Sequence, residues 1–313
     1  MLSPRNIGLL LFLLAEVAYF SWKSPYFATS GNFSNLLLSI SVIGVMAAVS
    51  TLVVVGRGLD LSLGSIVAVT GVVTAVTIEE LRWPWAAGLA AGIGVGGLCG
   101  LFNGVVIAWL RINPIIATIG TLSVFRGIAF VIKDGQTVLV ENSFILAIGS
   151  GRLGGVPVSV WLLLAAFVCA GWFAVRTAWG RSVYATGASP RAALIAGIRV
   201  TSLRFWMYVV SGMSAGIAGV MLIGQAGTAV PSAGTGYELI VVTAVLLGGT
   251  TLAGGEGAVW KTALGVLVIG ILNNGMALLA VPSFYQIIAN GVLLLLAVAV
   301  DQFHASRNVP VGE

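Results

Sequence analysis

Side chains that could perform covalent chemistry are scarce in this sequence. The 313 residues include one histidine, His304, and two cysteines, Cys99 and Cys169, which lie in apolar runs and form no CxxC pair. General acid–base and nucleophilic catalysis usually need such groups placed beside a partner. The cysteine spacing indicates neither a disulfide framework nor a thiolate metal site. We therefore expect no enzyme, no cofactor and no metal.

Two strings match nucleotide-binding motifs only in form. Residues 92–97 read GIGVGG, but they lie inside an apolar segment, without the preceding strand that a dinucleotide fingerprint needs. Lys261 and Thr262 form the last dipeptide of a phosphate-binding loop, but Trp260 stands where that loop requires glycine. We do not expect this chain to bind ATP by that route.

The composition is that of a membrane protein. Hydrophobic residues make up 58% of the chain and charged residues 8%, whereas roughly 25% of the residues are charged in a typical soluble protein. The 42 glycines follow no Gly-X-Y period, which excludes collagen. We expect an all-α, polytopic membrane protein whose residues 1–313 form a single transmembrane domain.

Ten segments are long and apolar enough, or nearly so, to cross a hydrocarbon core about 30 Å thick. The first contains Glu16 and is followed by no small-residue cleavage site, so we expect a retained helix. The eighth is short and either crosses or re-enters within surrounding protein, and a re-entrant segment would place the C-terminus outside. The expected spans are 7–22, 34–55, 62–78, 85–110, 114–132, 157–175, 205–226, 237–250, 261–281 and 283–300.

The basic residues are unevenly distributed among the loops. With cytoplasmic termini, ten lie in inner loops and four in outer loops, as the positive-inside rule predicts. Arg126 lies near the outer end of the fifth span, where we expect it to snorkel to the interface. No basic face favours nucleic acid. The inner set is Arg5, Arg57, Arg111, Arg176, Arg181, Arg191, Arg199, Arg204, Lys261 and Arg307, and the outer set is Lys23, Arg82, Lys133 and Arg152.

Small residues recur at helical spacing in two spans. Gly92, Gly96 and Gly100 are four apart, as are Gly212 and Gly216. Glycine faces let helix backbones approach closely in a membrane. We expect these faces to pack within the bundle or against another subunit.

The longest inner connection contains a short predicted helix. Pro190 is placed like a first helical residue, the run from Arg191 to Ala196 favours helix, and Gly197 ends it. At the membrane surface this helix would expose Ala192 and Ala193 for close docking by another protein. The alternative is a plain surface connection.

At these residues the chain resembles a known family. RAALIAG at 191–197 is similar to the EAAxxxG loop by which permeases of ATP-binding-cassette importers engage their ATPase, with Arg191 in place of Glu. Other blocks resemble the permeases for ribose, xylose, galactofuranose and similar monosaccharides, in consistent order over most of the chain. Branched-chain amino acid permeases share the layout, but DLSLGS and GRSVYATGA are more similar to the sugar branch. The blocks are GRGLDLSLGS (56–65), NPIIATIGTLSVFRGIAFVI (113–132), GRSVYATGASPRAALIAGI (180–198), GYELIVVTAVLLGGTTLAGGEG (236–257) and ILNNGMALLAV (271–281).

The resemblance implies a ten-helix permease half in the bacterial inner membrane. It implies pairing with an identical or homologous half, two cytoplasmic ATPase subunits and a periplasmic sugar-binding protein. The ATPase would pull on a coupling loop at about 177–204 and bias the permease between inward- and outward-facing arrangements. The residues implied in this coupling are Pro190, Arg191, Ala192, Ala193 and Gly197.

If the cargo is a monosaccharide, its path should offer amides, hydroxyls and an aromatic face. Thr118, Thr121 and Phe125 share one face of the fifth span, and Asn113 lies at its inner mouth. Asn273 and Asn274 are adjacent amides in the ninth span, about 100° apart around the helix. Each residue could instead bond its own backbone or a neighbouring helix.

The loop 56–65 has two interpretations. It contains an Arg57/Asp60 pair, and Asp60 or Ser62 could cap the third span. Alternatively, Arg57, Asp60 and Ser62 form an inner gate or an ATPase contact.

Two other classes of function remain open. A facilitator or secondary carrier would need no ATPase, and a membrane scaffold would need only the glycine packing faces. The first would transport sugar as an isolated chain, and the second would have no cytoplasmic partner.

Overall fold

The computed structural model describes the backbone of residues 4–307 and the side chains of residues 7–303. The side chains of Arg5, His304 and Arg307 therefore lie outside the described residues. The chain is almost entirely helical, with short turns and two small antiparallel strand pairs, β1 with β4 and β2 with β3.

The helices and strands have the following bounds. The α-helices are α1 (Pro4–Lys23), α2 (Ser30–Val55), α3 (Leu63–Ala75), α4 (Trp85–Gly104), α5 (Pro114–Ile132), α6 (Ser143–Ser150), α7 (Val158–Arg176), α8 (Ala178–Ala188), α9 (Pro190–Ile195), α10 (Val200–Ala226), α11 (Tyr237–Leu247), α12 (Val259–Leu278) and α13 (Ser283–Arg307). The π-helical turns η1 (Val76–Glu80) and η2 (Val105–Trp109) extend α3 and α4. The strands are β1 (Val138–Leu139), β2 (Arg152–Leu153), β3 (Val156–Pro157) and β4 (Thr228–Ala229).

The prediction of an all-α, polytopic membrane protein is confirmed. Within the described residues, eight helical stretches are long and apolar enough to cross a membrane. They correspond to the second to seventh, ninth and tenth expected spans. α1 is not among the eight, and α11 is a shorter apolar helix of 11 residues. Ten crossings therefore stay a prediction.

The seventh span begins earlier than expected. α10 starts at Val200 rather than near residue 205, so the inner connection ends at Arg199. The first turn of α10 is polar on one side but buries Leu203, and this burial stabilises helix beyond the apolar run. The expected coupling loop of 177–204 is shortened accordingly.

α10 lies at the centre of the packing, against α2, α3, α4 and α6. The predicted glycine contact forms between α4 and α10. A Cβ added at Gly96 would lie 2.5 Å from the Gly212 carbonyl oxygen, and one at Gly100 would overlap the Tyr208 carbonyl. Larger side chains would push these backbones apart, so the contact depends on glycine.

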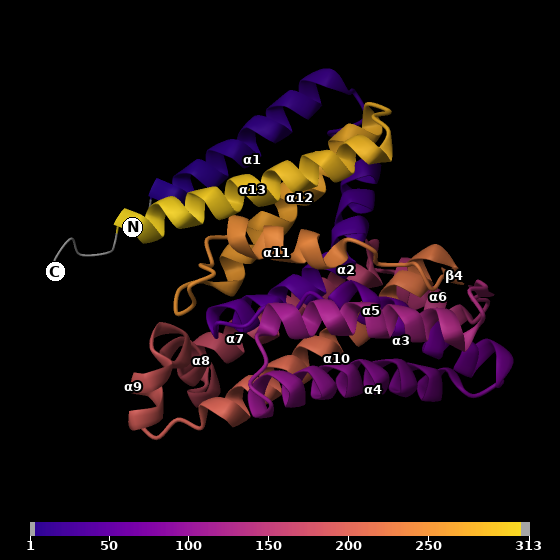
Figure 1. Ribbon diagram of the computed structural model, residues 1–313. Coiled ribbons are helices and arrows are strands. Elements are labelled where there is room, and N and C mark those ends of the chain that lie inside the picture. Colours follow the sequence, from indigo (N-terminus) through magenta and orange to yellow (C-terminus); the bar gives the residue numbers. More distant parts are fainter. Residues whose placement is uncertain (1–3, 308–313) are drawn as a thin grey trace.

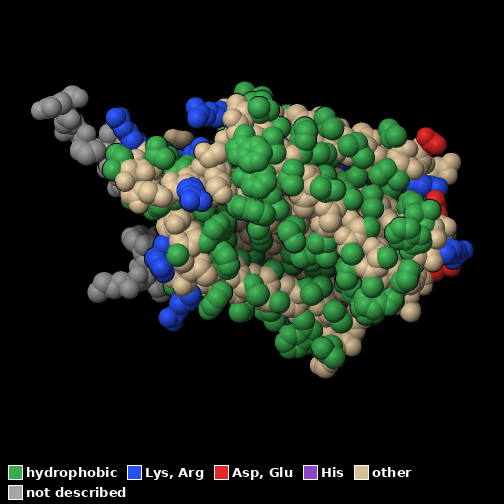
Figure 2. All heavy atoms as spheres, turned by 90° about the horizontal axis from the view of Figure 1, so that it is seen from below, with side chains coloured by type: hydrophobic (Ala, Val, Ile, Leu, Met, Phe, Trp, Pro, Cys, Tyr) green, Lys and Arg blue, Asp and Glu red, His purple; other side chains and the backbone are tan. Residues whose placement is uncertain are grey.

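Figure 1 shows α1, α12 and α13 on one side of the molecule and α3, α4, α5 and α10 on the other. α8 and α9 lie at one end, here called the α9 end, where α1 also begins and α13 ends. α6 and β4 lie at the opposite end, here called the α6 end. In Figure 2 many Lys and Arg side chains gather at the α9 end, whereas Asp and Glu accompany them at the α6 end.

Candidate functional site

The short helix α9 begins and ends where Pro190 and Gly197 predict. Pro190 is its first residue, and the Ser189 side chain caps it by accepting a hydrogen bond from the Ala192 N–H over 3.3 Å. Gly197 has a φ of 84°, a left-handed conformation that glycine adopts with little strain. Its N–H donates to the Leu194 carbonyl, which closes the helix end.

The predicted exposure of Ala193 is wrong. Its side chain is 3% exposed, because α9 packs this face against α8 and α10. Arg191 and Ala192 are exposed as expected. The outward apolar surface of α9 consists instead of Leu194 and Ile195, which are 65% and 81% exposed. A docking partner would contact these two residues.

Arg57, in the turn after α2, links that turn to the end of α8. Its Nε donates to the Gly187 carbonyl over 2.6 Å, and its Nη2 donates to the Ala188 carbonyl over 3.1 Å. These two residues directly precede Ser189, the N-cap of α9. The expected Arg57/Asp60 pair is not formed, because the guanidinium is engaged by these carbonyls and Asp60 bonds elsewhere.

The loop after α11 completes this junction. The Gly255 N–H donates to the Val55 carbonyl over 2.8 Å, and the Tyr184 hydroxyl of α8 donates to the Gly257 carbonyl over 3.0 Å. Burial raises the pKa of Tyr184, which keeps the hydroxyl protonated as a donor. The end of α2, α8 and the loop before α12 are therefore bonded together beside α9.

Asp60 lies in a buried polar cluster. Its side chain is 3% exposed, and its Oδ1 accepts hydrogen bonds from the Ser62 hydroxyl and N–H over 2.6 and 3.1 Å. Its Oδ2 accepts from the Ser211 hydroxyl of α10 over 2.8 Å. Ser62 is the N-cap of α3 but makes no capping bond with its side chain. The predicted helix cap is therefore replaced by a link between the α2–α3 turn and α10.

Sequence reasoning missed the partners of Asp60. The Asn103 side chain of α4 donates to the Ser62 hydroxyl over 2.8 Å, and the Tyr208 hydroxyl contacts the backbone of Leu59. Asn103 and Ser211 interrupt otherwise apolar or small-residue runs, which is the one local signal that could have indicated them. The cluster joins the start of α3 to α4 and α10.

The starts of α3 and α11 meet inside the bundle. The Gly234 carbonyl and Glu238 Oε2 lie against Gly64, where an added Cβ would overlap both. Glu238 Oε1 accepts the Gly236 N–H over 3.2 Å, while its buried Oε2 has no hydrogen-bond partner in the described structure. An 11-residue helix spans about half of the hydrocarbon core. The irregular chain before α11 is thus packed in protein, where a membrane tolerates it.

Arg126 holds the same irregular segment. Its Nη1 donates to the carbonyls of Pro231 and Ala233 over 2.9 and 2.6 Å. The guanidinium of Arg126 is therefore engaged by backbone carbonyls of the same chain, and its snorkelling to the interface stays a prediction.

The predicted polar face of α5 exists, and it is buried. Thr118, Thr121 and Phe125 all face inwards. The Thr118 hydroxyl donates to the Pro114 carbonyl over 2.8 Å, and the Thr121 hydroxyl donates to the Thr118 carbonyl over 3.3 Å. Asn113 is exposed and caps α5 by accepting the Ile115 N–H. In this conformation the two threonine hydroxyls and the Asn113 side chain bond the backbone of their own helix, and Thr118 also reaches the Leu59 carbonyl over 3.4 Å.

The adjacent asparagines of α12 have different environments. Asn274 and Asn32 of α2 exchange two side-chain hydrogen bonds of 2.9 Å each. Asn273 has a buried Oδ1 without a hydrogen-bond partner in the described structure. Both lie about one turn before the end of α12, towards the α6 end, and only Asn273 retains an unused polar atom.

The described side chains include no group of three or more His, Cys, Asp or Glu that could hold a metal ion. The site consists instead of three parts. One is the exposed short helix α9, the second is the hydrogen-bonded junction behind it, and the third is the pair of short helices α3 and α11, which begin inside the bundle. Half-helices with buried starts are typical of transporters.

Comparisons with known proteins agree with this architecture. Residues 32–298 match the family described as "Branched-chain amino acid transport system / permease component". The ribose import permease protein RbsC of Escherichia coli K12 is 39% identical over 296 residues, covering 93% of this chain and 92% of the relative. The L-arabinose ABC transporter permease protein AraH of Azospirillum brasilense is 36% identical over 300 residues, covering 96% and 88%.

A third relative has a similar degree of identity. The ribose import permease protein RbsC of Bacillus subtilis is 37% identical over 300 residues, covering 95% of this chain and 93% of the relative. No solved structure matches significantly. The family match covers most of the chain and includes α2, the α9 junction and α11, and the chain belongs to this family of membrane transport permeases.

Proposed function

We propose that this chain is the transmembrane permease subunit of an ATP-binding-cassette importer for a monosaccharide. The observation that carries the proposal is the similarity to permeases named for ribose and L-arabinose, at 36–39% identity over more than nine tenths of the chain. The chain is a transport protein rather than an enzyme, and ATP hydrolysis belongs to a separate subunit. The absence of a phosphate-binding glycine before Lys261 is consistent with this division.

The proposed location is the bacterial inner membrane, with the α9 end in the cytoplasm. The basic residues favour this orientation, because Lys and Arg gather at the α9 end while acidic groups accompany them at the α6 end (Figure 2). Both ends of the chain would then lie on the cytoplasmic side.

The proposed ATPase contact is α9. Leu194 and Ile195 form an exposed apolar surface beside Arg191 and Ala192. Such a surface on a short, capped helix outside the membrane-spanning stretches is typical of a protein contact. A second permease, identical or homologous, and a periplasmic sugar-binding protein would complete the importer.

The hydrogen bonds behind α9 provide a route for coupling. Movement of α9 would be transmitted through Gly187 and Ala188 to Arg57, and from there along the α2–α3 turn to Asp60 and α10. α10 packs against α2, α3 and α4. The ATP-bound ATPase would bind one arrangement of the bundle better than the other, and it would thereby shift the equilibrium between the two.

In the proposed pathway, polar groups without fixed partners contact the sugar. Asn273 meets this description directly, and Thr118, Thr121 and Phe125 would join after a rearrangement that frees their hydroxyls and ring. Asn113 and Asn274 have structural partners, so we assign them no direct contact.

The experiment is gentle purification of the tagged chain from its native membrane, followed by mass spectrometry of co-purifying proteins. The complex is then assayed for ATP hydrolysis with ribose- or arabinose-loaded binding proteins. We expect an ATPase subunit and sugar-dependent stimulation. A chain that carries sugar in liposomes without an ATPase would instead be a facilitator.

A further inference from the structure

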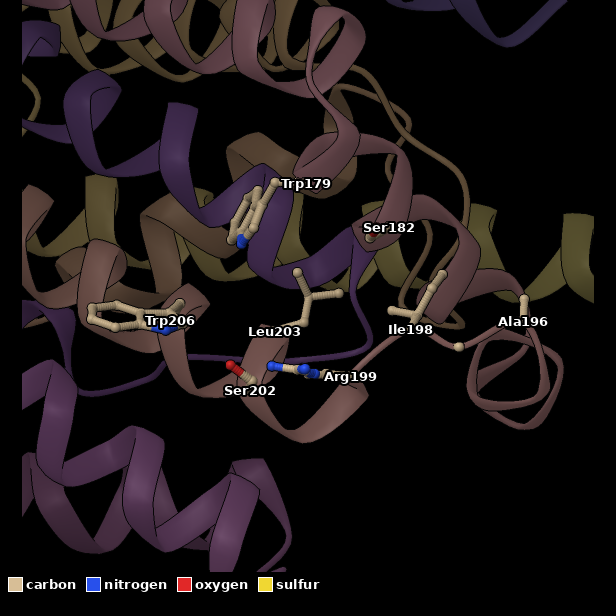
Figure 3. Close-up of a pocket in the computed structure, with 9 residues that line it drawn as sticks. Trp179, Ser182, Ala196, Ile198, Arg199, Ser202, Leu203 and Trp206 are labelled. Carbon is tan, nitrogen blue, oxygen red and sulfur yellow. The ribbon is translucent and has the colours of Figure 1, made fainter.

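A pocket of about 400 Å³ lies between α8 and the start of α10, beside the end of α9. Figure 3 shows Trp179 and Ser182 on one side, Arg199, Ser202 and Leu203 on the other, and Trp206 at one end. The size is within the range of small-molecule sites. The residues Leu194 and Ile195, assigned above to the ATPase contact, do not line it.

The polar part of the pocket is suited to an anion. Arg199 is exposed, and its side chain has no hydrogen bond or ion pair within the described structure. Ser202 lies beside Arg199, and Ser182 lies across the pocket. The Ser182 hydroxyl donates to the Ala178 carbonyl over 2.9 Å, so Ser202 is the serine that has a free donor for an anion. Between residues 176 and 208 the chain has five arginines and no acidic residue. No carboxylate from this stretch of sequence therefore competes for the guanidinium, and no ion pair engages it in the described structure.

The start of α10 adds to the positive potential in the pocket. No side chain caps its first turn, although the helix is 27 residues long. Uncapped first-turn N–H groups and the positive end of the helix dipole favour a negative group. This contribution supports the site that the cavity, Arg199 and Ser202 already define.

The apolar part of the pocket continues into the membrane. Trp206, Val210 and Met213 follow each other at spacings of four and three on α10, and each is at least 41% exposed. They form a continuous apolar stripe that runs from the pocket along a membrane-spanning helix. Tryptophan is enriched where hydrocarbon meets headgroups, which fits the two indoles at the pocket.

We propose that this pocket binds an anionic phospholipid from the leaflet at the α9 end. Its phosphate contacts Arg199 and Ser202, the indoles of Trp179 and Trp206 flank the headgroup, and one acyl chain lies along the Val210 and Met213 stripe. A soluble anion would not use the stripe. Because Gly197 and Ala196 line the same pocket, the lipid would brace the end of α9 against α10. The inference does not depend on which cargo the permease carries.

The test is native mass spectrometry of the full-length protein, exposed in detergent to equal amounts of phosphatidylglycerol and phosphatidylcholine. We expect preferential retention of phosphatidylglycerol. Arg199→Gln should reduce the ratio of bound phosphatidylglycerol to phosphatidylcholine about five- to tenfold, as expected for loss of one charge-assisted contact near a membrane surface. Arg191→Gln removes an equal charge from α9 outside the pocket and should leave the ratio unchanged. Equal ratios for the two variants would overturn the proposal.

A second pair of variants tests the apolar part of the site. Trp206→Ala should shorten retention of both lipids, whereas Trp172→Ala, which removes an exposed indole from α7, should not. Thermal melting of each variant identifies one that has lost its fold, in which case Ser202→Ala provides a milder change.

Two further outcomes would contradict the assignment. Displacement of phosphatidylglycerol by millimolar inorganic phosphate alone would show that the site recognises a free anion. Loss of the bound lipid when the ATPase subunit assembles on the permease would show that the pocket belongs to the protein contact. Retention in both experiments is the result we expect.

Discussion

Arg57 donates a hydrogen bond to the carbonyl of Gly187 across 130 residues of sequence, over 2.6 Å. Through this bond the turn after α2 is attached to the residues that precede α9. Arg57 also has a φ of 62°, which is uncommon for a residue with a side chain. Backbone strain of this kind persists where surrounding interactions hold it. Here those interactions are the Arg57 hydrogen bonds, which join the turn after α2 to the helix that we propose as the ATPase contact.

Arg57→Gln should weaken coupling without loss of the complex. It removes charged hydrogen bonds of the kind that contribute about 1.5–3 kcal/mol each, so we expect sugar-stimulated ATP hydrolysis to fall about tenfold or more. The measurement is ATPase activity of the purified complex with loaded binding protein. Arg111→Gln is the matched control, because Arg111 also has a positive φ and its side chain makes no hydrogen bond or ion pair within the described structure. Equal effects of the two changes would remove Arg57 from the coupling route.

Leu194→Asp should prevent assembly with the ATPase. A carboxylate in the centre of a desolvated contact costs several kcal/mol, enough for a loss of 100-fold or more, by rough estimate, in affinity. Leu153→Asp is a close control, since both leucines are 65% exposed and Leu153 lies in the short strand β2. Co-purification of the ATPase is measured for each. Normal recovery with Leu194→Asp would place the ATPase contact elsewhere.

Ser211→Ala should destabilise the bundle by about 1–3 kcal/mol, because it leaves Asp60 Oδ2 buried without its donor. Ser214→Ala is the control on the same helix, because the Ser214 hydroxyl bonds only the backbone carbonyl of Ser211. Thermal unfolding in detergent compares the two. A similar melting temperature for both variants would mean that the Asp60 cluster contributes little to stability.

Gly96→Val should disrupt the contact between α4 and α10. The added side chain meets the Gly212 carbonyl and the backbone of Gly216, neither of which can move aside alone. We expect a loss of about 3 kcal/mol or more, above the usual range for overpacking because the obstacle is backbone. Gly94→Val lies half a turn away, where an added Cβ meets nothing within 4 Å. Both are measured by thermal unfolding, and comparable stability would argue against close glycine packing.

Local signals in the sequence were sufficient for some parts of the fold. The membrane-spanning character follows from apolar length, and the limits of α9 follow from Pro190 and Gly197, because proline suits a first helical position and glycine a left-handed end. The close packing of the glycine faces follows from their spacing, whereas the pairing of α4 with α10 is visible only in the structure. Each of these features depends on one segment alone or on composition.

Features that depend on distant partners could not be predicted in this way. A six-residue helix gives no period that indicates its buried face, so Ala193 was assigned to the wrong side. Asp60 and Ser211 are 151 residues apart, and only tertiary packing shows that Asp60 bonds α10 rather than Arg57. Arg126 similarly binds carbonyls more than a hundred residues away, in a segment whose path into the bundle has no sequence signature.

The most direct test of the proposed function is uptake of labelled ribose and L-arabinose by liposomes that contain this chain with its co-purified partners. The loaded binding protein is added outside, and ATP is enclosed on the side of the α9 end. We expect accumulation of one sugar above its external concentration with ATP, and none with a non-hydrolysable analogue. Equal equilibration with and without ATP, or accumulation of neither sugar while a branched-chain amino acid accumulates, would contradict the account.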